Sequence, residues 1–124
     1  MPPTDRSIAE GPPPALPRVR HRLAVPKSIP GKFREIVLQE LTAADELAAE
    51  EAAASPRARV DEICKAMIVE VDGKPVSAAD ASSDAAWEAF HPKLRSLVNT
   101  AWARYHLAND KEADGFFASD TVEV

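Results

Sequence analysis

The feature that most constrains the fold of this chain is a change of pattern within residues 32–54, KFREIVLQELTAADELAAEEAAA. Its first part holds a short apolar run, residues 36–38, between polar neighbours, which predicts a half-buried β-strand over residues 33–38. Its second part begins at Thr42, with Asp45 three residues later. This spacing is typical of a capping box at a helix start, with a short acid in place of the usual Glu or Gln. The stretch therefore predicts a strand followed at once by a helix.

Another strand is predicted just before this stretch. In residues 18–26, RVRHRLAVP, the side chains alternate with a period of two, so one side can pack while the other carries charge. Residues 27–32 include Pro30 and Gly31, have the composition of a turn, and lead directly into the strand at 33–38. We therefore expect an N-terminal β-hairpin.

Apolar residues at helical spacing predict a further helix after Ser55. Ser55 followed by Pro56 is a common helix start, because serine can cap the first turn and proline fits the first helical position. Beyond it, apolar residues recur three or four positions apart along one stripe: Val60, Ile63, Cys64 and Met67. We expect Cys64 to be a small buried side chain on that stripe, not a nucleophile.

The last part of the chain predicts one more hairpin and further helical segments. An Asp-Gly pair lies between two apolar runs in residues 68–76, which is typical of a tight hairpin turn. Ser83, or Asp84 beside it, is the expected cap of a short helix that follows. Apolar residues at helical spacing over 94–105 predict the best-defined helix of the chain, and residues 111–118 could add a last turn or two.

Together these elements predict an α+β fold, with an N-terminal β-hairpin followed by a small bundle of three to five short helices. We expect a single domain over residues 18–118, preceded by an extended or flexible Pro-rich arm over 1–17 and followed by a loose tail over 119–124. The arm holds six of the eleven prolines, and this density discourages both helix and sheet.

Cysteine usage and hydropathy indicate the setting of the protein. Cys64 is the only cysteine, so no intramolecular disulfide can form and nothing points to an oxidising compartment. No apolar run approaches the roughly 18 residues of a membrane span, and the first residues lack the apolar core of a signal peptide. The sequence therefore predicts synthesis in the cytosol and no membrane partner.

The net charge of -5 is unevenly distributed. Residues 18–34 hold six basic and no acidic residues, whereas residues 35–124 hold 18 acidic and 8 basic ones. Such a chain can either pack its own basic segment against its acidic part or bind a partner with its own charge pattern. A nucleic-acid-binding adaptor is the less favoured alternative, because the basic segment contains one aromatic residue, Phe33, and the acidic remainder repels phosphate.

No catalytic constellation stands out in the sequence. None of the three histidines belongs to a recognisable motif, and a single cysteine cannot complete a zinc site with His91 and His106. The four glycines are too far apart to form a phosphate-binding loop. We therefore expect a protein that is not an enzyme and that uses no cofactor and no metal.

The remaining candidate for function is a protein-binding surface. Six of the seven aromatic residues lie between positions 87 and 117, where they could form either core or an apolar patch for a partner. The acids of the first helix are either a solvated face or a surface for a basic partner. The candidate partner-binding residues are four aromatic and three acidic ones: Trp87, Phe90, Trp102, Tyr105, Glu46, Glu50 and Glu51.

Two segments carry a resemblance to a known family: HRLAVPKS at residues 21–28 and FREIVLQELTAADELAAEEA at residues 33–52. IVEVDGKPV and residues 94–117 match more loosely. The chain resembles the small tail assembly proteins of bacteriophages, often called tail assembly chaperones. The family pattern is two short strands, the second ending in an apolar residue, followed by Leu or Pro, Thr and an acidic helix start. The Pro-rich arm departs from this pattern.

The resemblance implies a non-enzymatic protein, made in the bacterial host cytoplasm, that binds the helical tape-measure protein and keeps it soluble while tail-tube subunits assemble. Such a chaperone is absent from the finished particle. Related genes of similar size instead code for baseplate or tail-tip subunits that remain in the virion tail or contractile particle, a role that an ordered Pro-rich arm would suit. The implied partners are therefore other phage tail proteins, namely the tape-measure protein and the tail-tube or baseplate subunits, and the chain could also form an oligomer.

Overall fold

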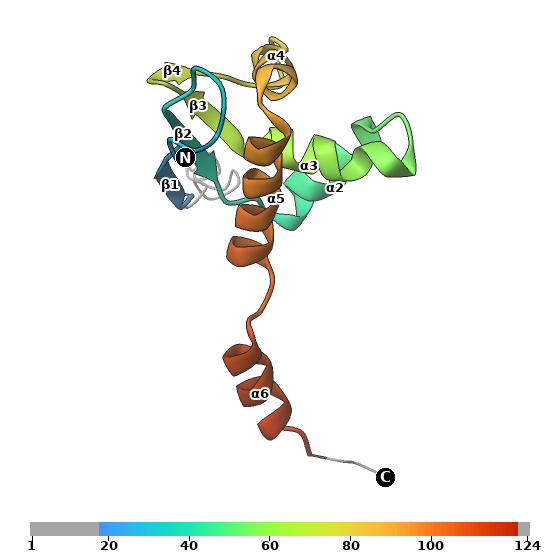
Figure 1. Cartoon of the computed structure of the whole chain (residues 1–124). Coiled ribbons are helices and arrows are strands. Elements are labelled where there is room, and N and C mark those ends of the chain that lie inside the picture. The colour runs from blue at the N-terminus through green and yellow to red at the C-terminus, as the bar shows by residue number, and fades with distance from the viewer. Residues whose placement is uncertain (1–17, 122–124) are drawn as a thin grey trace, which may run out of the picture.

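The computed structural model describes residues 18–121, in which an antiparallel sheet packs against a group of helices (Figure 1). The sheet has the order β1-β2-β3-β4, with strands β1 (Arg20–Ala24), β2 (Glu35–Gln39), β3 (Ile68–Val71) and β4 (Lys74–Pro75). The helices are α2 (Ala43–Ala52), the 3-10 turn η1 (Pro56–Ala58), α3 (Arg59–Met67), α4 (Ser82–Ala89), α5 (Pro92–His106) and α6 (Asp110–Ala118). The predicted α+β class is confirmed. The predicted Pro-rich arm lies outside the described residues, as do the last three residues of the tail.

Strands β1 and β2 form the predicted N-terminal hairpin. Leu23 pairs with Ile36 and His21 pairs with Leu38 in antiparallel register. The alternation of β1 has the predicted consequence, because His21 and Leu23 are half-buried while Arg22 between them is exposed. One face of this hairpin therefore contributes to the core.

The second predicted hairpin, β3–β4, does not stand alone. Strand β3 pairs antiparallel with β2, with Val71 opposite Ile36, and the register shifts between Val37 and Leu38. This pairing joins the two hairpins into one four-stranded sheet in which β2 is an inner strand. Ile36 and Leu38 belong to the core, and Val37, which lies on the opposite face of β2, is buried as well.

The starts of α2 and η1 follow the sequence signals. Thr42 Oγ1 accepts a hydrogen bond from the backbone N of Asp45, and the Asp45 carboxylate accepts one from the backbone N of Thr42, so the capping box is complete. Ser55 caps η1 by accepting from the backbone N of Ala58, with Pro56 at the first helical position.

The predicted cap of α4 is wrong. The residue before this helix is Ala81, in the left-handed region at φ 62°, and its side chain makes no capping bond. The Asp80 carboxylate takes over that role by accepting from the backbone N and the hydroxyl of Ser82. Ser83 lies inside the helix and is buried. An Asx-type turn at Asp80, two residues before α4 begins, therefore takes the place of the predicted cap at Ser83 or Asp84.

The core lies between the sheet and helices α3, α4 and α5. Its members come from all of these elements: Ile36, Leu38, Cys64, Met67, Ile68, Val71, Trp87, Phe90, Leu94, Val98 and Ala101. Helix α6 contributes no buried residue. In Figure 1 it extends away from the rest of the protein at the end of a short connection after α5.

Candidate partner-binding surface

Two of the predicted partner-binding aromatics belong to the core. Trp87 and Phe90 are 5% and 3% exposed, and the Phe90 ring meets the Phe33 ring edge-on at 5.0 Å between centroids. Arg95 covers the Trp87 ring from the next helix, 5.5 Å from its centroid. These side chains hold α4 against the sheet, so they present no surface to a partner.

The other two predicted aromatics are half-buried on α5 and make contacts within the chain. Trp102 Nε1 donates a hydrogen bond of 2.8 Å to the Glu46 carboxylate on α2. The Tyr105 ring stacks on the His21 ring of β1, with 3.7 Å between centroids and 8° between planes. The structure therefore brings Trp102 and Glu46 together, two residues that the sequence assigned separately to apolar and charged binding.

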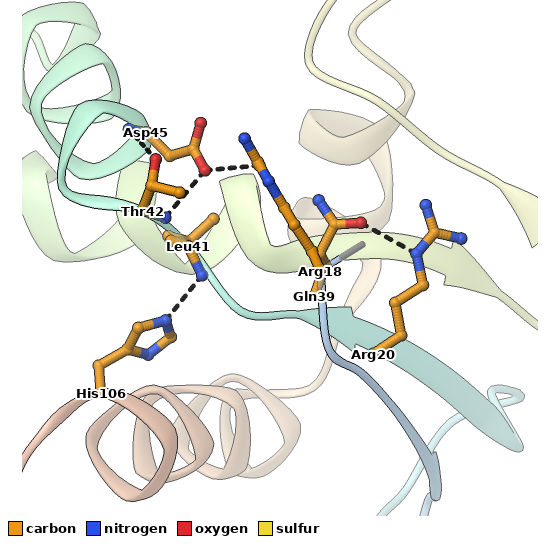
Figure 2. A network of polar contacts seen from close by, with 7 residues as sticks. All are labelled: Arg18, Arg20, Gln39, Leu41, Thr42, Asp45 and His106. Atoms are coloured by element: carbon orange, nitrogen blue, oxygen red, sulfur yellow. Dashed lines mark hydrogen bonds and ion pairs between the residues drawn. The ribbon is translucent and has the colours of Figure 1, made fainter. Parts of the chain in front are cut away.

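A polar network fastens the hairpin, the start of α2 and the end of α5 to one another (Figure 2). Arg18 donates to the Asp45 carboxylate at 2.6 Å, and His106 Nε2 accepts a bond of 2.8 Å from the backbone N of Leu41. The hydrogen bond from the backbone N of Thr42, with further help from Arg18, lowers the pKa of Asp45 below its usual value. The β2–α2 junction is therefore held in place by hydrogen bonds with Arg18, which precedes β1, and with the end of α5.

The His106 imidazole connects α5 to the β2–α2 junction through both of its ring nitrogens. Its Nδ1 lies 2.8 Å from the carbonyl oxygen of Trp102, while its Nε2 accepts from Leu41. This arrangement requires the proton on Nδ1, which donates to the carbonyl. A histidine that sequence reasoning left without a role thus connects α5 to the β2–α2 junction.

The basic segment packs in part against the acidic remainder of the chain. Arg22 Nη1 lies 2.5 Å from the Glu35 carboxylate and 3.0 Å from the Glu70 carboxylate, so it links three strands. Together with the Arg18–Asp45 pair, these contacts support the self-complementary alternative. Glu50 and Glu51, the other predicted acids, are exposed on α2 and remain open to a partner.

An apolar groove lies between the β1–β2 hairpin and α5. It encloses a cavity of about 210 Å³, and we call it the β1–α5 groove. Buried side chains such as Leu94 and Val98 form its floor, while Leu23 and Tyr105 are half-buried and Leu97 is 42% exposed at its rim. The full lining is Leu23, Ala24, Val25, Pro26, Ile36, Leu38, Leu94, Leu97, Val98, Thr100, Ala101, Arg104 and Tyr105. At this size the groove suits side chains of a polypeptide better than a drug-sized ligand, whose sites run about 300–1,000 Å³.

Helix α6 carries a second apolar surface, the aromatic pair Phe116 and Phe117. These rings touch each other edge-on at 5.2 Å between centroids and are 72% and 68% exposed. Asn109 and Glu112 form a complete capping box, but the helix has only nine residues. Gly115 in its interior costs about 1 kcal/mol relative to alanine, and isolated helices under about 12–15 residues are marginal in water.

Neither Leu97 nor the Phe116–Phe117 pair is among the partner-binding residues that the sequence predicts. A signal for the first was present, because Leu97 and Arg104 are seven residues apart and share one flank of α5, away from Trp102. For α6, the signal is that residues 110–115 are mostly acidic or glycine, so the helix has no continuous apolar stripe that could pack against the core.

The cysteine thiol is buried, and the potential metal ligands are not grouped, in the part of the chain that the structure describes. Burial, with a smaller contribution from nearby Asp61, raises the pKa of the Cys64 thiol to about 12, so this thiol stays protonated. Residues 18–121 contain no group of three or more His, Cys, Asp or Glu placed to hold a metal ion. Within the same residues, no helix has the length and apolar character to cross a membrane.

Comparison with family models, with curated proteins and with solved structures gives no match for this chain.

Proposed function

We propose that this chain is a phage-like tail morphogenesis protein, a tail assembly chaperone that binds an apolar helical segment of the tape-measure protein before the tail tube closes around it. Binding takes place in the β1–α5 groove, with Leu97 and Tyr105 at its rim. In this role the protein performs no chemistry and acts in the bacterial host cytoplasm.

The observation that carries the proposal is the position of the segments that resemble the family. Residues 21–28 and 33–52 fold as one continuous β1–β2–α2 unit, and the hairpin of that unit forms one wall of the exposed apolar groove. Grooves of this kind bind amphipathic helices through apolar side chains three or four residues apart. Glu50 and Glu51, exposed on α2, supply negative charge for basic residues of the partner.

A retained baseplate or tail-tip subunit is the second candidate function. The exposed aromatic pair of α6 favours it, because a helix that extends from the body suits a permanent contact with a neighbouring subunit. The two functions differ in whether the chain is present in finished particles.

The proposed function is tested by co-expressing the C-terminally tagged chain with the tail proteins encoded beside it and identifying the co-purified proteins by mass spectrometry. We expect a long helical tape-measure-like protein before particle assembly and none of this chain in purified particles. A fixed copy number in particles would replace the chaperone with the structural subunit. Purification of the chain without any tail protein would contradict both functions.

Matched variants locate the contact. Leu97→Asp introduces a charge at the rim of the groove and should lower partner recovery by at least about tenfold. Leu47→Asp is the control, because Leu47 is equally apolar and 57% exposed but lies on α2, outside the groove lining. Equal recovery with both variants would exclude the groove as the binding site. Glu50→Lys with Glu51→Lys should weaken recovery less, and only at low salt.

A further inference from the structure

The described residues present two apolar surfaces without a partner, and these surfaces have complementary shapes. One is concave, the β1–α5 groove, with Leu97 exposed at its rim. The other is the Phe116 and Phe117 pair, which is mostly exposed on α6. Helix α6 extends away from the sheet and from α5 (Figure 1). An exposed aromatic pair on a short helix is costly to leave in water, and a second surface that could cover it exists in the same chain.

Charge around the two surfaces is complementary as well. Helix α6 carries Asp110, Glu112 and Asp114 against the single base Lys111. Arg104 lines the groove, and a hollow that shares Pro26 and Leu97 with the groove is lined by Lys93. Among the ion pairs of residues 18–121, none engages Arg104 or Lys93. Arg104 and Lys93, which form no ion pair within residues 18–121, are therefore placed to pair with acidic residues of an α6 helix that enters the groove.

The connection between α5 and α6 directs α6 away from its own groove. It consists of residues 107–109, and Leu107 and Asn109 have extended backbone with ψ of 141° and 174°. Even a fully extended connection of three residues reaches only about 10 Å. Helix α6 must reverse direction at this connection to enter the groove of its own chain, whereas the groove of another copy is open to it as it stands.

We propose that two copies of this chain form a symmetric dimer in which the Phe116–Phe117 pair of each α6 inserts into the β1–α5 groove of the other copy. Exchange of an identical element between protomers is a low-cost route to a dimer. In the two-fold arrangement both helices and both grooves are used between the same two copies, so assembly stops at two. Docking also stabilises α6, a helix that is too short and too glycine-containing to be stable alone.

The area involved fits a weak but specific dimer. An aromatic side chain buries about 150–250 Å². With about 70% of each ring open to solvent, two reciprocal contacts remove about 800–1,400 Å² from water when both sides are counted. This range lies mostly below that of stable interfaces, about 1,200–2,000 Å², and only reaches its lower end, so we expect a reversible dimer that forms at micromolar concentrations. The dimer would also keep the groove covered until a partner displaces α6, although its existence does not depend on the proposed function.

Sedimentation equilibrium of the purified full chain at about 1–300 µM tests this proposal directly. We expect a monomer–dimer equilibrium that Phe116→Ala with Phe117→Ala weakens at least about tenfold, and that Leu97→Asp weakens similarly. Leu47→Asp is the control and should leave the dimer unchanged. Gly115→Ala should tighten the dimer about two- to fivefold by favouring the helix, since a Cβ at this position meets no atom within 4 Å.

Mixing the two weakened variants gives the decisive result. A chain with intact α6 but altered groove can still dock on a chain with intact groove but altered α6, so a heterodimer should form more tightly than either variant pairs with itself. A protein that stays monomeric throughout the range would overturn the proposal. A dimer that neither variant weakens would also overturn it. Slow amide hydrogen exchange of the groove residues in a protein that stays monomeric would overturn it as well, because another segment of the same chain would then cover the groove. Because this test uses no other tail protein, its failure is separate from failure of the proposed function.

Discussion

Helices α5 and α6 follow each other along the chain and both carry large apolar side chains, yet they differ in what those side chains do. In α5, Leu94, Val98 and Ala101 lie in the core between the sheet and the other helices. In α6, Phe116 and Phe117 remain mostly exposed, and no side chain of the helix is buried. The comparison shows that apolar content alone does not determine a helix's place in the fold, since the chain already covers its sheet with α3, α4 and α5.

The largest expected difference between the two helices concerns the core. Leu94→Ala should lower the free energy of unfolding by about 2–5 kcal/mol, because it leaves a cavity beside Val98 under the sheet. Phe116→Ala in dilute monomer should change it by less than about 0.5 kcal/mol, despite the larger side chain removed. Urea denaturation followed by the fluorescence of Trp87 and Trp102, both outside α6, measures each value.

Leu97→Ala supplies the intermediate case for this measurement, because Leu97 is on α5 but 42% exposed. Its cost should fall between the other two. A cost for Phe116→Ala as large as that for Leu94→Ala would mean that α6 packs into the core, and the comparison between the helices would no longer hold.

The local elements of this fold could be predicted from the sequence because their signals lie within a few residues. Thr42 with Asp45, Ser55 with Pro56, and the period of two in β1 each act on their immediate neighbours, and each appears as expected. The pairing of β3 with β2 could not be predicted, since it joins residues 30 or more positions apart and no local pattern specifies it. The cap of α4 was missed for a different reason, because two local signals compete there: the Asp80 carboxylate accepts from the backbone N of Ser82, and Ser83 lies inside the helix.

The candidate site was only partly predictable for a related reason. Trp87, Phe90, Phe116 and Phe117 belong to one aromatic-rich region, and the sequence does not say which of them the sheet will cover. Burial of the first two and exposure of the last two follow from tertiary packing. The contact between Trp102 and Glu46 is equally non-local, because it depends on how α5 crosses α2.

Two capping boxes allow the comparison to be made with nearly identical chemistry. Thr42 and Asp45 cap α2 in the body, and Asn109 and Glu112 cap α6. Thr42→Ala should lower the free energy of global unfolding by about 1 kcal/mol. Asn109→Ala should leave global unfolding unchanged and instead speed amide hydrogen exchange within residues 110–118, because unfolding of α6 is local.

Hydrogen exchange followed by mass spectrometry, together with urea denaturation, separates these two outcomes. A loss of global stability with Asn109→Ala comparable to that with Thr42→Ala would show that α6 and the body unfold as one unit.

Acid should affect the body and α6 differently, and this is the smallest expected effect. Asp72 Oδ1 accepts hydrogen bonds of 2.9 Å from the backbone N of both Arg34 and Glu35, and these bonds lower the pKa of Asp72. A carboxyl whose pKa is lower in the folded state contributes stability that is complete above its unfolded value of 3.8 and is lost as the pH falls through its folded value. Asp72→Asn keeps an acceptor oxygen and tolerates the positive φ of 49°, but it cannot titrate. Wild type should therefore be more stable than Asp72→Asn at pH 7, and urea denaturation between about pH 5 and pH 3 should show this advantage shrinking.

Asp114→Asn in α6 is the matched control: the Asp114 carboxylate takes part in no hydrogen bond or ion pair among the described residues, so the dependence of stability on pH in this variant should run parallel to that of wild type. If the advantage of wild type over Asp72→Asn stayed constant across this range, the link between the β3–β4 turn and β2 would not depend on the charge of Asp72.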